Sequence, residues 1–192
     1  MFSLMAPSEE EIRRFLSEQK NSDFSYRHVG SSTTTVPPGY NLDHHRVELG
    51  GGELTWRRAK AAICAWRMFE MPWVSLHWPN APIQAGTDVA ISVQHFGFYS
   101  LNACRIVYVV DEDGPVNRFG FAYSTLAEHA ESGEERFMVE WNRDHDRVWY
   151  DILAFSRPQK ILARLGYPLS RALQKKFARA SMAAMLKAAR QR

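Results

Sequence analysis

The stretch Arg118–Pro158, RFGFAYSTLAEHAESGEERFMVEWNRDHDRVWYDILAFSRP, decides the fold of this chain. Two short polar connections divide it, at 127–133 and 142–146. Between them apolar residues alternate with polar or small ones, as in β-strands, in three segments: 118–125, 134–141 and 148–155. Because parallel neighbours need long crossovers, two short connections in succession predict an antiparallel meander.

Length and composition indicate a single globular unit. Of the 192 residues, 45% are hydrophobic and 23% charged, as in an ordinary soluble protein. We expect one domain with a substantial core: a helical extension over 1–23, a sheet over 24–156 that contains a helix at 54–71, and a C-terminal helix over 157–190. No apolar run approaches the roughly 20 residues of a membrane span, and the acidic start lacks a secretory signal. We therefore expect a cytoplasmic protein.

The sequence predicts neither a metal site nor a cofactor. Cys64 and Cys104 lie in apolar surroundings without metal-ligand spacing, so we interpret them as reduced core thiols. The triple glycine at 50–52 is not a phosphate-binding loop, because Glu-Leu-Thr follows it instead of Gly-Lys-Ser/Thr. Nucleophile elbows and dinucleotide fingerprints are absent as well.

Helix and strand signals outside the organising stretch complete an α+β order. Ser8 and Glu11 form a capping box that predicts a helix to about Gln19. A second helix is expected over Leu54–Met71, ended by Pro72, and a turn over 97–103. Further short strands are expected at 24–29, 41–49, 73–78, 87–96 and 104–111.

The C-terminal region is basic and amphipathic. It has ten Lys/Arg and no Asp/Glu from Arg157 onward, so the net charge of +3 leaves −7 on residues 1–156 (3 − 10). Helical spacing predicts an apolar stripe through Leu169, Leu173, Phe177, Ala180 and Ala184, with Arg171, Lys175 and Arg179 turned away. This charge fits either a solvated helix face or contact with an anionic membrane surface or a partner. Nucleic-acid binding is not expected, because no zinc finger, ribonucleoprotein motif or GxxG clamp accompanies the charge.

Glu135 lies on the same strand face as Phe137, Val139 and Trp141. A carboxylate there is either at the solvated end of its strand or paired with a cation. Alternatively, it lies in a cavity with a raised pKa and is available for proton transfer. The alternation along the strand is compatible with the structural placements and with the cavity placement of Glu135.

Several long motifs resemble an uncharacterised family found in bacteria and plants, UPF0548. They occur in the family's order: NLDHHRVELGGGE (41–53), AWRMF (65–69), GFAYSTLAEHAESGEERF (120–137), VWYDILAFSRP (148–158) and LGYPLSRALQKKF (165–177). The resemblance implies membership of the helix-grip superfamily of birch-pollen-allergen, lipid-transfer and polyketide-cyclase-like proteins. It therefore implies a curved antiparallel sheet wrapped around a long C-terminal helix, with a largely apolar internal cavity. The family has no established activity.

Two hypotheses use that cavity. In the first, the protein binds an apolar or aromatic small molecule, and the expected lining residues are Phe119, Phe121, Tyr123, Phe137, Trp141, Phe177 and Ala180. The alternative for these side chains is that they simply fill the interior. In the second, the protein is a cofactor-independent cyclase, dehydratase or hydrolase whose catalytic candidates are Glu135, His95, Tyr123 and Arg105.

A third hypothesis places the function on the surface, through contact of the basic C-terminal helix with an anionic membrane or a partner. The loop that carries His129, Glu131 and Glu134 is a candidate for a mouth or lid of the cavity. The sequence leaves the ligand and the oligomeric state open.

Overall fold

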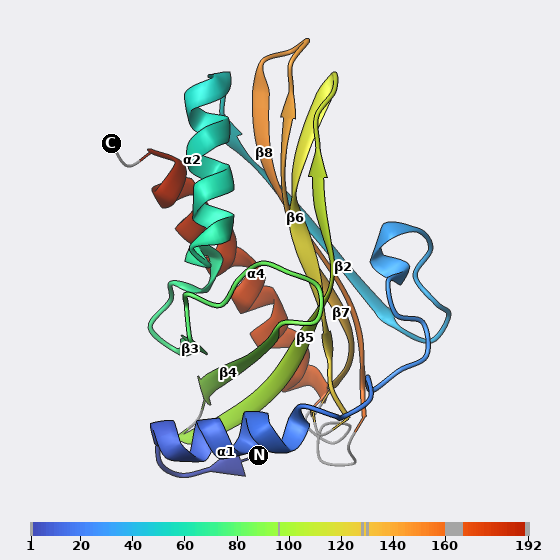
Figure 1. Ribbon diagram of the computed structural model, residues 1–192, viewed down its shortest axis with the longest axis vertical. Coiled ribbons are helices and arrows are strands. Elements are labelled where there is room, and N and C mark those ends of the chain that lie inside the picture. Colours follow the sequence, from blue (N-terminus) through green and yellow to red (C-terminus); the bar gives the residue numbers. More distant parts are fainter. Residues whose placement is uncertain (1, 96, 128, 130, 160–166, 191–192) are drawn as a thin grey trace.

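One antiparallel sheet of eight strands organises the protein (Figure 1). The computed structural model describes residues 2–95, 97–127, 129, 131–159 and 167–190. The strand order is β2-β8-β7-β6-β5-β4-β3, and β1 pairs with β5. The strands are β1 (Phe2–Ser3), β2 (Asn41–Gly50), β3 (Val74–His77), β4 (Asp88–His95), β5 (Phe98–Glu112), β6 (Val116–Thr125), β7 (Glu131–Asn142) and β8 (Arg147–Pro158). The helices are α1 (Glu9–Gln19), α2 (Gly52–Cys64) and α4 (Tyr167–Arg190), with 3₁₀ turns η1 (Ser31–Thr33) and η2 (Arg67–Phe69).

The predicted meander is confirmed. β6, β7 and β8 pair antiparallel in sequence order, and Phe121, Phe137 and Ile152 are aligned across them. The capping box of α1 also forms, since Ser8 and Glu11 bond reciprocally. Two connections are shorter than predicted: β7 already begins at Glu131, and β5 begins at Phe98 because residues 98–105 all pair with β4.

The segment after α1 is not the predicted strand. Phe24 makes an isolated bridge to Leu126, and the residues that follow cover the outer face of the sheet (Figure 1). There the carboxylate of Glu134 on β7, whose residue is 3% exposed, accepts hydrogen bonds from both the backbone and side chains. Its donors are the Tyr26 hydroxyl (2.5 Å), the Ser124 hydroxyl (3.2 Å), the Ser32 hydroxyl and the amides of Gly30 (2.7 Å) and Ser32 (3.0 Å). One buried carboxylate thus replaces strand pairing as the anchor of this segment.

The C-terminal helix lies on the concave side of the sheet, as expected, but it begins later (Figure 1). β8 continues through Arg157 and Pro158, which pair with Ser132 and Glu131 of β7, and α4 begins at Tyr167. The sequence also predicts a break or bend near Gly166, Tyr167 and Pro168. Gly166 lies outside the described residues, and Tyr167 and Pro168 are the first residues of α4. No described helix combines the length and the apolar character needed to cross a membrane.

The buried face of α4 is rotated from the predicted stripe. Its buried residues are Ala178, Ser181, Met185 and Ala189, and the Ser181 hydroxyl bonds to that of Tyr150 on β8 (2.7 Å). Arg171 is not turned away, because its guanidinium forms an ion pair with Asp43 on β2. Lys175 and Arg179 are exposed as predicted.

The predicted helix 54–71 ends early, at Cys64. Trp66 takes a left-handed conformation (φ 54°), and the chain then forms η2. The Trp66 side chain is 2% exposed, its indole nitrogen donates to the carbonyl of Ala81 (3.0 Å), and its ring lies 4.7 Å from that of Phe121. Tertiary packing therefore overrides helix periodicity here. Cys64 is exposed at this point rather than in the core, whereas Cys104 is buried, and both are free thiols.

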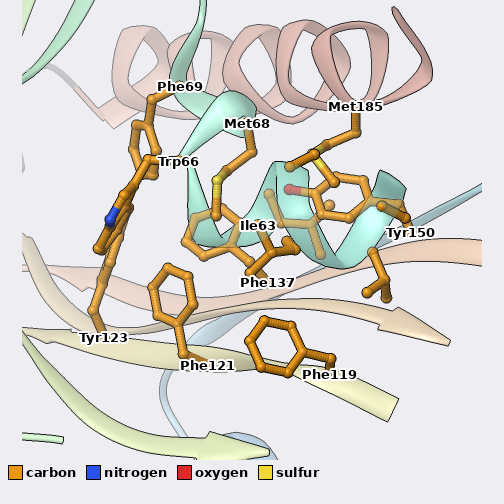
Figure 2. Close-up of a cluster of buried hydrophobic side chains, with 14 of the residues drawn as sticks. Ile63, Trp66, Met68, Phe69, Phe119, Phe121, Tyr123, Phe137, Tyr150 and Met185 are labelled. Carbon is orange, nitrogen blue, oxygen red and sulfur yellow. The ribbon is translucent and has the colours of Figure 1, made fainter. Parts of the chain in front are cut away.

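The segment formed by α2 and η2, which we call the plug, fills half of the space between α4 and the sheet. In Figure 2, Trp66, Met68 and Phe69 lie between α4 and the strands that carry Phe119, Phe121 and Phe137. Burial of these large side chains is the main favourable contribution to folding in this half of the molecule.

Replacing Trp66 by alanine is expected to lower the free energy of unfolding by about 3–5 kcal/mol, because a large buried aromatic side chain leaves a cavity. Alanine at position 66 has to adopt the same left-handed backbone conformation as tryptophan. The loss in the free energy of unfolding therefore measures the packing of the Trp66 side chain. Urea denaturation measures it. The control is Trp149→Ala, which removes a partly exposed ring stacked under Arg46 and should cost about 1 kcal/mol. Equal losses in the two variants would contradict the role of the plug.

Glu134→Gln should destabilise the protein by about 2 kcal/mol or more, because the new amide group faces the donor N–H groups of Gly30 and Ser32. Limited proteolysis should then cut within residues 24–34 faster than in the wild type. Glu48→Gln, at an exposed ion pair with Arg147, should change stability by less than about 1 kcal/mol. Unchanged proteolysis of Glu134→Gln would show that the carboxylate does not anchor the segment.

Candidate functional site

A cavity of about 590 Å³ occupies the other half of the concave side, beside the plug. Its walls are β1, β2 and β4 to β8, the chain from η2 to β3, and the first half of α4. Most of its lining is apolar. The aromatic members of the lining are Phe2, Phe69, Trp73, Phe98, Tyr123, Phe155 and Phe177.

The plug decides which predicted lining residues reach this cavity. Tyr123 and Phe177 line it. Phe119, Phe121 and Phe137 do not, because they are 6%, 0% and 0% exposed beneath the plug (Figure 2). These three side chains therefore fill the interior, which was the alternative to lining the cavity.

Trp141 and Ala180 also lie outside the cavity lining. The indole nitrogen of Trp141 donates to Asp146 at the β7–β8 turn (3.0 Å), and Ala180 packs against the core. Phe69, Trp73 and Phe98 line the cavity but were not predicted to do so. For Trp73, the sequence signal was the cluster of tryptophans around it, because clustered tryptophans are found either in a core or in the wall of a pocket.

Two of the four catalytic candidates are in contact. The Tyr123 hydroxyl on β6 donates to Glu135 Oε2 on β7 at 2.7 Å, because the two residues are register partners. His95 lines the same cavity from the end of β4, and β5 and β6 lie between its strand and that of Glu135.

The prediction that Arg105 reaches the cavity is wrong. Its neighbours Cys104 and Ile106 face the core, so strand alternation turns Arg105 to the outer face. There it pairs with Asp88 (2.6 Å) and donates to the carbonyls of Gln19, Lys20 and Ser22 at the end of α1. Its apolar neighbours in the sequence did not show which face it occupies.

Burial raises the pKa of Glu135 to about 7. The hydrogen bond from Tyr123 opposes this net shift of the pKa, and the negative charge of Asp43 makes a smaller contribution in the same direction as burial. Burial and the charge of Glu135 in turn hold the pKa of Tyr123 well above its usual range. Both protonation states of Glu135 are therefore populated at neutral pH, so this carboxyl group can give or take a proton.

Polar side chains close one end of the cavity and attach α4 to the sheet. Glu131 on β7 accepts hydrogen bonds from Ser170 and from Gln174 (2.8 Å), and Gln174 also donates to Ser156 on β8 (2.8 Å). Arg171 holds Asp43. His129, whose ring accepts the amide proton of Glu131, lines the cavity beside them, so part of the loop suggested as a mouth does border it. Among the described residues, no group of three or more His, Cys, Asp or Glu could hold a metal ion.

The raised pKa of Glu135 predicts a pH-dependent stability difference between the wild type and Glu135→Gln. Above the unfolded-state value near 4.5 the unfolded chain loses this proton first, so the wild type is progressively destabilised until pH passes about 7. Glutamine lacks this titration. The stability of Glu135→Gln relative to the wild type should therefore rise by about 3 kcal/mol between pH 4.5 and pH 8.5, as measured by urea unfolding. A stability difference between the two proteins that does not change with pH would contradict the raised pKa of Glu135.

Comparison with known proteins agrees with this architecture. Residues 25–184 match a family described as a domain of unknown function (DUF1990). A UPF0548 protein of Dictyostelium discoideum is 35% identical over 98% of this chain and 95% of its own length. A UPF0548 protein of Deinococcus radiodurans is 36% identical over 93% and 94%.

Solved structures show the fold but little sequence likeness. A hypothetical protein from Helicobacter pylori has a TM-score of 0.55 and 13% identity, covering 88% of this chain and 100% of its own. Human STARD10 has a TM-score of 0.52 and 10% identity, covering 96% and 80%. The predicted helix-grip fold is confirmed. Sequence and structure together establish that the chain belongs to the UPF0548 family and has the helix-grip fold.

Proposed function

We propose that the protein binds a small molecule with an apolar body in the cavity between the sheet and the first half of α4. The carrying observation is the cavity itself, whose volume of about 590 Å³ lies in the range of small-molecule sites. Its combination of apolar walls with a few polar groups is the composition that buries a ligand body and sets its orientation.

Exposed apolar residues around the cavity support this proposal. Phe2, Phe98 and Leu169 all line the cavity and are 57%, 48% and 41% exposed. They come from β1, the start of β5 and the start of α4, which are distant in sequence. Exposed apolar side chains that line one cavity indicate a place where an apolar molecule binds.

Proton-transfer catalysis is a second candidate function, favoured by the contact between Glu135 and Tyr123. In that case Glu135 moves the proton and Tyr123 stabilises a developing oxyanion with its hydroxyl. Arg105 has no part in it, since it lies on the outer face. Binding comes first in either case, because a substrate must enter the same cavity.

Filling the cavity tests the binding proposal. Ala154 lies on β8 between Asp43 and Glu135 and lines the cavity. The neutral fluorescent probe N-phenyl-1-naphthylamine should bind the wild type saturably, and Ala154→Phe should weaken that binding at least tenfold, a loss of about 1.4 kcal/mol, because phenylalanine occupies the space.

Ala183→Phe is the matched control, since Ala183 is exposed in the second half of α4 and outside the cavity lining. It should bind the probe like the wild type. Circular dichroism confirms that both variants remain folded. Failure of the wild type to bind, or equal binding by all three proteins, would overturn the proposal.

A further inference from the structure

We infer that the ligand of this cavity carries a cationic hydrogen-bond donor, an ammonium or amidinium group, that pairs with Glu135. The inference rests on the proposed binding function and specifies its ligand class. It depends on three features of the cavity: a carboxylate that no described cation neutralises, aromatic walls around it, and polar neighbours that are already paired with one another.

Glu135 differs from the other carboxylates near the cavity. Asp43 is neutralised by Arg171, and Glu131 accepts from Ser170 and Gln174. Within the described part of the chain, no cation forms an ion pair with Glu135, and its hydrogen bond from Tyr123 engages only Oε2. The second oxygen, Oε1, is therefore available to a donor brought by the ligand. A charged donor gives the strongest bond to a carboxylate in such an enclosed place.

The aromatic walls favour a cation over a neutral donor. Tyr123 and Phe69 have ring centroids 6.2 Å apart, and Phe69 and Phe177 have centroids 5.5 Å apart, so the three rings form a continuous surface. Trp73 adjoins it, 6.4 Å from Phe177. The Trp73 ring already contacts a cation from outside the cavity lining, since Lys176 Nζ lies 4.5 Å from its centroid. Aromatic faces combined with a carboxylate are the groups that bind ammonium ions.

The ionisable groups around Glu135 predict the pH dependence of binding. They are Tyr123 on β6, Cys104 on β5, Tyr150 on β8, and Asp43 and His45 on β2, with Arg171 on α4 held by Asp43. His95 on β4, His129, and Glu131 on β7 line the same cavity. Burial and neighbouring charges raise the pKa of Cys104 and Tyr150, so these groups stay neutral near pH 7. A bound ammonium favours the ionised form of Glu135 and displaces its proton. Amine affinity should therefore rise from pH 6 to pH 8.

Three ten-carbon probes test this inference by displacement of N-phenyl-1-naphthylamine below their critical micelle concentrations: decylamine, 1-decanol and decanoate. At pH 8 decylamine should bind at least tenfold more tightly than decanol, and decanoate should bind weakest because its charge repels that of Glu135. At pH 6 the advantage of the amine should shrink at least threefold.

Glu135→Gln should abolish the preference for the amine and change decanol affinity less than threefold. Glu48→Gln makes the same charge change outside the cavity lining and should keep the preference, which excludes a long-range effect of net charge. If decanol displaces the fluorophore but decylamine has no advantage, or if Glu135→Gln keeps that advantage, the inference is overturned and the binding function stands. If the fluorophore does not bind the wild type at all, both are overturned.

Discussion

The structure depends on how the plug is wedged between the sheet and α4. A curved sheet and one helix leave more space between them than the side chains of the helix can fill. Here α2 and η2 occupy one half of that space, with Trp66 at the point where the helix breaks. A left-handed tryptophan costs roughly 1–2 kcal/mol in backbone strain, and this is offset by the burial of its ring against Phe121 and by the bond to the Ala81 carbonyl. The other half remains open as the cavity.

The contrast between Glu134 and Glu135 shows what the sheet does with adjacent carboxylates. Alternation along β7 sends them to opposite faces. On the outer face Glu134 is surrounded by donors and anchors the segment 24–34. On the concave face, the described part of the chain gives Glu135 one hydrogen-bond donor, the hydroxyl of Tyr123. A charge enclosed without compensation is costly, and proteins retain such groups mainly at functional sites. This asymmetry supports the proposal that the functional site lies on the concave side of the sheet.

The cavity combines three properties that belong together in a small-molecule site. In the proposed function the aromatic and aliphatic walls would supply the free energy of burial, and Glu135 would supply orientation and charge selectivity. The network around Asp43, Arg171 and Glu131 attaches α4 to the sheet. The network lies between α4 and three strands of the sheet, so helix position and cavity shape are coupled. Binding and proton transfer would use the same carboxyl group, which is why the two candidate functions share one site.

Alternation and connection length were enough to predict the meander of β6–β8, the capping box of α1 and, with the family resemblance, the helix-grip fold. They were also enough to place Glu135 and Tyr123 on one face, because period-two alternation is a local property of a strand. Alternation and connection length could not show that Arg105 lies on the outer face. They also could not show that the cavity is not lined by Phe119, Phe121 and Phe137. Those outcomes depend on which side of a strand meets α1 and on where the plug lies, and both are contacts between segments far apart in the chain. Local periodicity determined which residues share a face, whereas long-range packing decided which part of that face is solid and which part is hollow.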